Sequence, residues 1–233
     1  MKDREFKFVQ EMFDTIAPRY DFLNRLLSLR RDVYWRRALV ESLELTSGGT
    51  VLDAACGTAD VALEIVHSSL GRVAVVGIDF APEMLRLATA KTKSKPTISL
   101  VAADAFDMPF NNAGFSAVTM AFGIRNIQNK AAILQQFRQQ LKPGGRLAIL
   151  ELVTPTRGLA RSAYLFYFNT LLPLIGRFFS KHSFAYRYLP ESVANFPTAP
   201  EFAALMRRCG FTNVRYRKLT LGIAVLFVGD KPH

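Results

Sequence analysis

The ten residues from Val51 to Asp60, Val-Leu-Asp-Ala-Ala-Cys-Gly-Thr-Ala-Asp, constrain the fold of this chain more than any other stretch. They begin as an apolar strand that contains Asp53, and they end in a turn of small residues around Gly57. Glycine has no Cβ, so it permits a tight turn and a close approach of a ligand. Helical spacing of apolar residues follows from 59 to 68. This order of strand, turn and helix is typical of the unit that opens a nucleotide-binding α/β domain.

A second acidic residue, Asp79, strengthens that interpretation. It ends the apolar run 73–78 and follows Gly57 at roughly the twenty-residue spacing that nucleotide-binding domains show between the glycine turn and an acidic residue. At the tip of a second strand, its carboxylate can accept hydrogen bonds from both hydroxyls of a ribose. The alternative is an ordinary turn glycine at 57 and an ordinary helix cap at 79, before Pro82.

The residues around the turn also discriminate between nucleotides. A dinucleotide site has the pattern G-x-G-x-x-G and a P-loop has G-x-x-x-x-G-K-[ST], and this turn has neither. Asp53 would repel a pyrophosphate but would suit a ligand with a positive end, such as the ammonium group of an amino acid. A ribose, an adenine and an amino acid together make S-adenosylmethionine (SAM). We therefore expect SAM as the cofactor, with Asp53, Gly57 and Asp79 among its contacts.

Apolar runs and helical patterns alternate from residue 50 onward, which predicts an α/β fold with a mostly parallel sheet. The turn Pro143-Gly144-Gly145 precedes the fifth strand, and Gly222 indicates a hairpin between two closing strands. The predicted strands lie at about 51–55, 73–78, 98–102, 115–122, 146–153, 214–219 and 223–228, and the predicted helices at about 59–68, 82–93, 129–141 and 199–209.

Ligands of open parallel sheets lie at the carboxyl ends of the strands. Asp104 and Ala105 follow the third predicted strand, where an adenine edge could be met, and Arg125 follows the fourth. We therefore expect Gly57, Asp79, Asp104 and Arg125 to face one crevice.

Three helical segments precede the first strand. Apolar residues at helical spacing occupy 5–17, and Pro18 is expected to end this helix because proline disfavours the helical state of the residue before it. A short helix or a tight coil is expected at 20–28. Asp32 is expected to cap a third helix, which carries apolar residues on one side.

The length of 233 residues suits a single α/β domain. We expect 1–46 to form a lid that also walls the substrate site, and 47–233 to form the SAM-binding core with a substrate-side insertion at 155–198. Within that insertion, 163–180 is rich in aromatic residues and leucine, but it is too short and interrupted to span a bilayer, which takes about 20 apolar residues. Three interpretations stay open: a core helix, an interfacial helix, or the wall of a site for a greasy substrate.

The formal net charge of +11 indicates an anionic neighbour, either nucleic acid or an acidic membrane surface. Because the basic residues are spread out rather than gathered in blocks, a soluble protein that is merely basic is the other interpretation. The two cysteines, Cys56 and Cys209, indicate no disulfide framework, and the three histidines show no metal-ligand spacing. The N-terminus resembles no signal peptide. We expect a cytoplasmic protein without a metal site.

Several segments together resemble one known family. They are Tyr20-Asp21-x-Leu23-Asn24 with Ser28 and Trp35, Leu141–Arg146 followed by Glu151, Phe122–Asn126, Tyr186–Ser192, and the tail Leu219-Thr220-x-Gly222. By these motifs the chain resembles the ubiquinone/menaquinone biosynthesis C-methyltransferases over nearly its whole length. The Lys-Pro-Gly-Gly motif alone is common among SAM enzymes, whereas the first segment combined with those around Arg125 and Tyr188 is specific.

The resemblance implies a SAM-dependent methyltransferase with a Rossmann-like α/β fold: a mostly parallel seven-stranded sheet, a C-terminal antiparallel hairpin and an N-terminal helical lid. It implies methylation of a ring carbon of a polyprenylated quinol, with demethylmenaquinol to menaquinol as the foremost reaction. By carry-over, it also implies SAM contacts at Thr58, Asp79, Asp104 and Ala105.

The chain departs from the family pattern at several positions. It has Asp32 where the family usually has a histidine, and Leu23 where the family usually has a methionine. Its glycine turn, 56–59, has fewer glycines, and Asp104 and Ala121 stand where asparagine and serine are frequent. The change at position 32 puts any proton-transfer role there in doubt.

A quinol carbon becomes nucleophilic when a ring hydroxyl loses its proton, and a nearby cation favours the resulting phenolate. Arg125 is our candidate for that cation, and Tyr188 is the second catalytic candidate. A guanidinium does not accept the proton itself, because its pKa lies above about 12. The alternative for Arg125 is a structural salt bridge to Asp79 or Glu151. The candidates for substrate binding, each of which could equally be structural, are Tyr20, Asn24, Arg125, Asn126 and Tyr186.

Other functions compete with this one. The basic charge prompts a methyltransferase of RNA or of a protein, and a methyltransferase of another small molecule is a further alternative. An amino-directed enzyme would show Asn/Asp-Pro-Pro-aromatic where this chain has Phe122-Gly123-Ile124-Arg125. A non-enzymatic partner in a quinone-synthesis assembly is the second rival. We expect no nucleic-acid partner and a peripheral association with the inner face of an anionic membrane, and a homodimer stays open.

Overall fold

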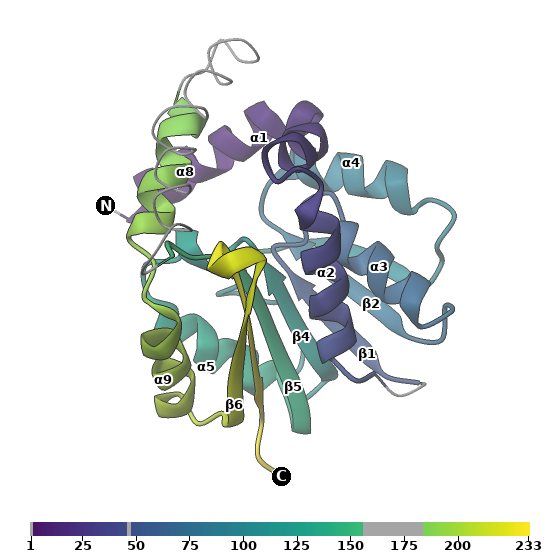
Figure 1. Cartoon of the computed structure of the whole chain (residues 1–233). Coiled ribbons are helices and arrows are strands. Elements are labelled where there is room, and N and C mark those ends of the chain that lie inside the picture. Colours follow the sequence, from purple (N-terminus) through teal and green to yellow (C-terminus); the bar gives the residue numbers. More distant parts are fainter. Residues whose placement is uncertain (1, 46–47, 156–183) are drawn as a thin grey trace.

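The computed structural model describes residues 2–45, 48–155 and 184–233, with 2–8 and 184–187 described as backbone only. Figure 1 shows a twisted sheet with helices on both faces and with α1 and α8 across one end. The strands are β1 (Thr50–Ala54), β2 (Ala74–Asp79), β3 (Ile98–Ala102), β4 (Phe115–Ala121), β5 (Leu141–Leu152), β6 (Thr212–Leu219) and β7 (Ala224–Asp230). The helices are α1 (Lys2–Leu27), α2 (Arg31–Ser42), α3 (Asp60–Ser68), α4 (Pro82–Thr92), η1 (Ile124–Asn126), α5 (Lys130–Gln140), α8 (Phe184–Ala194), α9 (Ala199–Arg208) and η3 (Thr220–Gly222).

The sheet has seven strands in the order β3-β2-β1-β4-β5-β7-β6. The first five in this order pair in parallel, whereas β7 pairs antiparallel with both β5 and β6. The strand order reverses beside β1, between β1 and β4, which is where ligands bind in doubly wound sheets. The predicted fold class, with its C-terminal hairpin, is confirmed.

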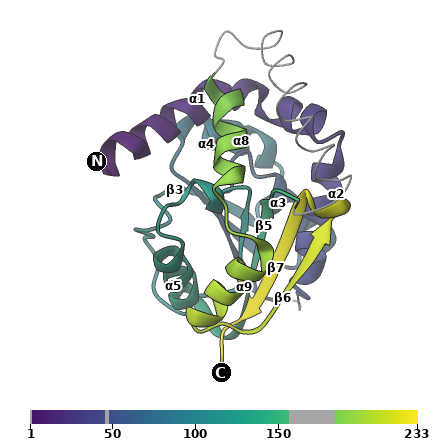
Figure 2. The ribbon, with the colours of Figure 1, turned by 60° about the vertical axis from the view of Figure 1, so that its left-hand side comes forward.

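Alternate residues of the central strands point into two separate hydrophobic cores. Val51 packs with α2 and α3 on one face of the sheet, and its neighbour Leu52 packs with α5 and α9 on the other. In β7, Leu226 and Phe227 divide between the same two cores. Figure 2 shows α5 and α9 together on one face. This two-sided burial explains why the strands read as nearly continuous apolar runs.

Helix α1 continues through Pro18, so the prediction that this proline ends the helix is wrong. A proline inside a helix costs about 3 kcal/mol because it lacks an N–H and clashes with the preceding turn. Contacts on both sides of it oppose that cost. Before it, the Asp14 carboxylate accepts a hydrogen bond from Glu83 N at 3.0 Å; after it, Asp21 accepts one from Thr58 Oγ1 at 2.6 Å. Tertiary contacts therefore override the local preference.

Asp32 lies inside the first turn of α2 and is not its cap, so that prediction is wrong too. The cap position belongs to Arg30, in a left-handed conformation and without a side-chain cap. The buried Asp32 carboxylate instead accepts hydrogen bonds from Ser28 Oγ at 2.8 Å and from Arg36 at 2.7 Å. It holds the end of α1 against α2.

The Pro143–Gly145 turn is present, but it lies within β5 rather than before it. Leu141 pairs with Phe115 and Arg146 pairs with Ala117, so the intervening residues form a bulge. Gly144 has a φ of 72°, a conformation that glycine adopts without strain.

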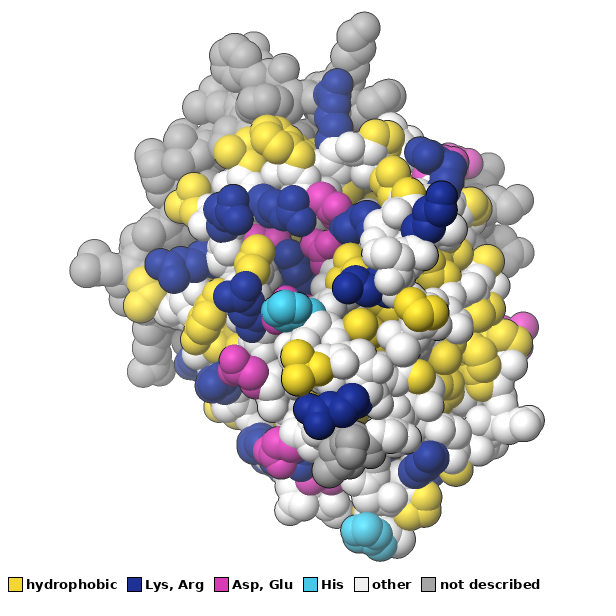
Figure 3. Space-filling view, turned by 90° about the vertical axis from the view of Figure 1, so that its right-hand side faces the viewer, with side chains coloured by type: hydrophobic (Ala, Val, Ile, Leu, Met, Phe, Trp, Pro, Cys, Tyr) yellow, Lys and Arg dark blue, Asp and Glu magenta, His cyan; other side chains and the backbone are white. Residues whose placement is uncertain are grey.

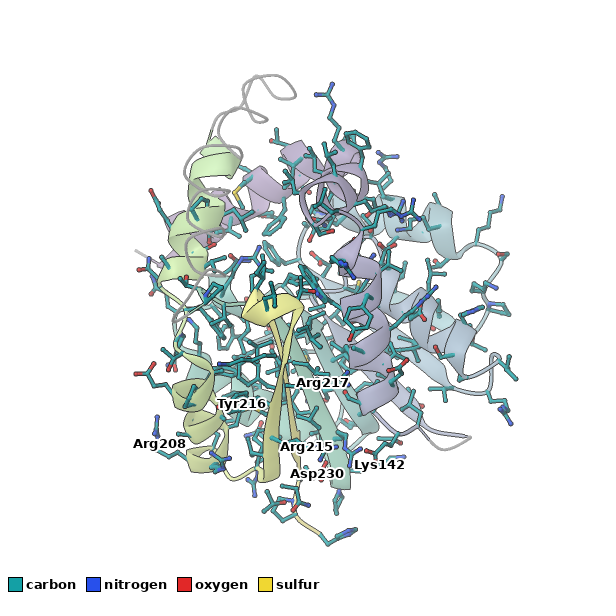
Figure 4. All side chains as sticks on the ribbon, viewed as in Figure 1. Lys142, Arg208, Arg215, Tyr216, Arg217 and Asp230 are labelled. Atoms are coloured by element: carbon teal, nitrogen blue, oxygen red, sulfur yellow. The ribbon has the colours of Figure 1, made fainter. Side chains whose placement is uncertain are left out.

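Strand β6 forms one edge of the sheet and is strongly basic. Figure 4 shows Arg215 and Arg217 on one side of β6 and Tyr216 on the other. The Tyr216 ring lies 6.1 Å from that of Phe227 in β7, and Arg215 forms a salt bridge with Glu44 at 3.3 Å. Charged side chains on an exposed edge discourage pairing with another chain.

Gly77 in β2 couples the sheet to the glycine turn, and this gives a test of the packing. A Cβ at Gly77 would lie 2.9 Å from Leu100 Cδ2, closer than real Cβ atoms approach, and 3.0 Å from Cys56 Sγ, tighter than most real Cβ contacts. We expect Gly77→Ala to lower the free energy of unfolding by about 1–3 kcal/mol through overpacking, measured by urea denaturation. The matched control is Gly114→Ala, whose nearest atom would be at 3.5 Å. Equal stability of the two variants would contradict the packing account.

Candidate active site

The glycine turn, which follows the carboxyl end of β1, has an unusual backbone conformation. Ala55, Gly57 and Ala59 all have positive φ values, 52°, 54° and 67°. Such values are uncommon for residues other than glycine and cluster at functional sites. The turn is anchored by Cys56 N, which donates to Ile78 O of β2 at 2.9 Å.

Asp79 holds the glycine turn in place from the tip of β2. One carboxylate oxygen accepts a hydrogen bond from Gly57 N at 2.8 Å, and the other accepts one from Ala81 N at 2.9 Å. Burial raises the pKa of this carboxyl, and the backbone N–H groups of Ala81 and Gly57 act in the opposite direction. Since a carboxylate oxygen accepts more than one hydrogen bond, Asp79 can hold the turn and still accept from ribose hydroxyls.

Asp53 is a buried carboxylate with one unsatisfied oxygen. It is 1% exposed, and its Oδ1 accepts a hydrogen bond from Thr119 Oγ1 at 2.8 Å. Its Oδ2 has no hydrogen-bond partner of good geometry within the described part of the chain, although the Ala62 backbone N–H lies near the carboxyl. Burial raises the pKa of Asp53 to about 7; the Thr119 hydrogen bond and the Ala62 N–H act against this and the charge of Asp79 adds to it. An unpaired buried acceptor suits a ligand that brings a positively charged donor.

Thr58 faces α1. Its hydroxyl donates to Asp21 Oδ1 of α1, and Lys91 of α4 donates to both Asp21 at 2.8 Å and Thr58 at 3.1 Å. Lys91 also pairs with Asp60, which pairs with Arg36 of α2 at 3.1 Å. These charges tie α1, α2 and α4 to the first turn of α3. The sequence gives no signal for Lys91, because it lies on the polar side of an ordinary amphipathic helix.

Asp104 and Ala105 lie just beyond β3, as expected, and both are half-buried. The Asp104 carboxylate accepts a hydrogen bond from Phe106 N at 2.9 Å, which shapes the loop. Ala105 packs against the core beneath it. Together with Asp53, Gly57 and Asp79, these residues line the carboxyl ends of three neighbouring strands.

Arg125 is fixed by a fully buried carboxylate. Its Nη1 pairs with Glu151 Oε1 at 3.0 Å, its backbone N donates to Glu151 Oε2 at 3.0 Å, and its Nη1 also donates to Phe122 O. The guanidinium side chain is 9% exposed, and its Nε has no partner among the described residues. The Glu151 alternative for Arg125 is therefore present, and it leaves one donor of the guanidinium unused.

Tyr20 interacts electrostatically with this arginine, and Tyr188 binds its neighbour Asn126. A Cβ at Gly57 would lie 3.9 Å from the ring of Tyr20, so α1 lies next to the glycine turn. Burial raises the pKa of the Tyr20 hydroxyl, while the Asn24 side chain and the charge of Arg125 act in the opposite direction. Opposite them, Tyr188 of α8 donates to Asn126 Oδ1 at 3.0 Å.

The structure thus brings most of the predicted residues to one edge of the sheet. The side chain of Tyr186 and the aromatic segment 163–180 lie outside the described residues. Two residues of the site, Lys91 and Thr119, were missed, and neither carries a signal in the sequence. Glu151 was named only as an alternative salt-bridge partner of Arg125, because it follows the Lys-Pro-Gly-Gly motif at the end of a predicted strand.

Solved structures with the same fold include SAM enzymes. The chain aligns with *Haemonchus contortus* phosphoethanolamine N-methyltransferase 2 in complex with SAM at a TM-score of 0.64 and 14% identity, covering 85% of this chain and 52% of that one. A SAM-dependent methyltransferase from *Aquifex aeolicus* gives a TM-score of 0.62 at 16% identity, covering 84% and 88%. The [4+2]-cyclase SpnF aligns at a TM-score of 0.71 and 14% identity, covering 96% of each chain. Because a cyclase shares the fold, the fold alone does not decide the reaction.

Sequence relatives are more specific. The chain is 47% identical over 226 residues to the ubiquinone/menaquinone biosynthesis C-methyltransferase UbiE of *Geotalea uraniireducens*, covering 96% of each. It is 46% identical over 224 residues to the demethylmenaquinone methyltransferase of *Deinococcus radiodurans*, covering 96% of this chain and 92% of the relative. A sequence model of the ubiE/COQ5 methyltransferase family matches residues 1–231. The chain therefore belongs to the ubiE/COQ5 methyltransferase family.

Proposed function

We propose that this methyltransferase moves the methyl group of SAM to a ring carbon of a polyprenylated quinol, with demethylmenaquinol as substrate and menaquinol as product. The names of its relatives support quinone biosynthesis over RNA or another small molecule as the target. The observation that carries the chemistry is Arg125, a buried cation with an unused Nε–H, at the carboxyl edge beside Tyr20.

SAM would lie along the carboxyl ends of β1 to β3. In this proposal Asp79 accepts the ribose hydroxyls, Asp53 pairs with the ammonium group, and Gly57 and Thr58 border the methionine end. Asp104 and Ala105 would border the adenine. The free oxygen of Asp53 and the tight turn at Gly57 support this orientation, because they put the only described unpaired buried carboxylate oxygen where the positive end would be.

The residues above this edge would activate the ring. Methyl transfer from a sulfonium is an in-line displacement, so alignment of donor and acceptor carbon contributes much of the rate. The Arg125 guanidinium would hold the phenolate oxygen, and Glu151 would hold the guanidinium. Tyr188, Asn126, Tyr20 and Asn24, with Tyr186, are the groups proposed to bind the ring hydroxyls and to pass the proton to solvent.

The basic charge fits a substrate that resides in a bilayer. We propose that the protein associates reversibly with the inner face of an anionic membrane, where polyprenylated quinols dissolve. No helix among the described residues has the length and apolar character needed to cross a membrane. Each basic group near such a surface contributes about 1 kcal/mol to attachment.

The first test separates catalysis from support at Arg125. We expect Arg125→Gln to lower kcat by about 100-fold, as for the loss of one oxyanion donor, and to leave SAM affinity unchanged. It should also destabilise the fold, because it leaves Glu151 buried without its partner. The double variant Arg125→Gln/Glu151→Gln removes that buried charge. Recovered stability with low kcat is the expected result, and recovery of both would return Arg125 to a structural role.

The second test uses the pKa of Asp53. The ionised carboxylate attracts an ammonium, so below about pH 7 SAM binding must release a proton. SAM affinity should therefore fall by up to about tenfold for each pH unit below 7. Calorimetry in two buffers of different ionisation heat measures the released proton directly. Asp53→Asn should bind more weakly and without this dependence between pH 5.5 and about pH 7, and a flat wild-type profile would exclude the pairing.

The third test concerns the redox state of the substrate. A quinone ring is electron-poor, whereas a quinol can form a phenolate that places electron density on the ring carbon. Arg125 and the tyrosines can polarise a hydroxyl but cannot supply electrons. With SAM and a short-chain demethylated menaquinone, product should form only when a chemical reductant is present. Equal rates with the oxidised ring would overturn the phenolate mechanism, and no turnover with either form would overturn the proposed substrate.

A further inference from the structure

The outward side of the lid helix carries large apolar side chains. Phe22, Leu26 and Leu29 are 54%, 36% and 80% exposed. Their spacing of four and then three residues places them along one side of α1 and its C-terminal turn. The adjacent side of the same stretch carries Leu23 and Leu27, which pack toward α8. Burial in the core therefore does not account for the outward set.

A fourth exposed leucine lies beside this end of α1. Leu221 in η3 is 82% exposed. The preceding Thr220 accepts a hydrogen bond from Trp35 Nε1 of α2 at 2.8 Å, and Ile223 packs in the cluster that contains Leu27. The η3 turn is thus fixed against the junction of α1 and α2. We call Phe22, Leu26, Leu29 and Leu221 the apolar rim.

Cations surround the apolar rim. Residues 15–37 contain six arginines and only two acidic residues, Asp21 and Asp32. Both aspartates already have cationic partners, Lys91 and Arg36. The exposed basic residues near the rim in sequence or at the η3 end of β6 are Arg25, Arg30, Arg31 and Lys218, of which Arg25 also lies 3.9 Å from Asp60. Figure 3 shows hydrophobic, Lys/Arg and Asp/Glu side chains together on the upper part of the face that it presents.

A single exposed leucine would not indicate an interaction surface. Leu70 is 79% exposed and has a φ of 52°, close to the 51° of Leu29. It stands between Ser69 and Gly71 in the turn after α3, away from the other exposed apolar residues. Single exposed leucines are normal on protein surfaces, whereas a group rimmed by polar residues marks an interaction site. Leu29 differs from Leu70 in having exposed apolar neighbours, and not in its backbone conformation.

We propose that the apolar rim is the surface that docks on an anionic phospholipid bilayer. The leucines and Phe22 would enter the boundary between headgroups and acyl chains, and the arginines would contact the headgroup phosphates. This inference rests on the proposed polyprenylated substrate and names the face that meets its membrane. A second copy of the chain fits less well, because two such rims would bring their arginines together.

Docking through the rim would place the site next to the bilayer. Helix α1 carries the rim on its outer side, while Tyr20 on the same helix lies next to the glycine turn. The distance from lipid to the reacting ring would then be about the width of one helix with its side chains, roughly 10 Å. A prenyl chain could stay in the membrane while its ring reaches Arg125.

The test compares full-length variants on vesicles. Asparagine adopts positive φ readily, so Leu29→Asn and Leu221→Asn leave the backbone unstrained, and Leu70→Asn is the matched control. Partition is measured by co-sedimentation with vesicles of phosphatidylglycerol and phosphatidylcholine, and with phosphatidylcholine alone. We expect the double variant to bind anionic vesicles at least about tenfold more weakly than wild type, and the control to bind like wild type. Equal binding by all three proteins would overturn the proposal.

Two further readouts complete the test. Turnover of a short-chain reduced quinol in detergent should be the same in the double variant and in wild type. A wild type that binds vesicles through the rim but does not turn over this quinol would refute the proposed function and leave the docking surface intact. A change from dimer to monomer in the double variant, with unchanged vesicle binding, would assign the rim to a second copy and overturn the bilayer proposal.

Discussion

Buried carboxylates at the carboxyl edge of the sheet are the constraint on which the site depends. Asp53, Asp79 and Glu151 are each at most 6% exposed, and a buried charge is costly unless it is paired. Asp79 is satisfied by backbone N–H groups, so it fixes the turn. Glu151 is satisfied by Arg125, so it fixes a cation. Asp53 has a hydrogen-bond partner on one oxygen only among the described residues, and the proposed SAM ammonium would pair with the other. The need of a buried carboxylate for partners therefore accounts for the positions of the glycine turn and of Arg125.

The alternation of strands and helices was predictable because each hydrophobic core needs apolar residues from the same central strands. Each central strand feeds two apolar faces, so its residues are apolar throughout, and the breaks between strands carry glycine, proline or charge. The edge at which the candidate site residues lie was predictable from the same pattern, because the carboxyl ends of parallel strands meet at one edge of the sheet. The positions of Gly57, Asp79, Asp104 and Arg125 needed no tertiary information.

Contacts between distant segments could not be predicted in this way. Pro18 disfavours a helix locally. The hydrogen bonds of Asp14 and Asp21 with residues 69 and 37 positions away, and the packing of Ala17 against Ala81 and Met84, favour the continuation of α1. Asp32 resembles a cap in sequence, yet Arg36 and Ser28 use its carboxylate. Lys91 has no local pattern at all. Hydrophobic periodicity predicts the helix or strand to which a residue belongs. It does not predict contacts with a distant element, which these side chains make.

The position of β7 has a consequence for how the chain is made. This strand is the last in chain order, yet it lies between β5 and β6 and contributes Val225 and Phe227 to one core and Leu226 to the other. While the chain emerges from the ribosome, five parallel strands can assemble, but the open edge of β5 stays unpaired until β7 is translated. The sheet is therefore completed only after β7 has been translated. Until then the nascent chain exposes an unpaired strand edge and apolar surface, which chaperones can bind.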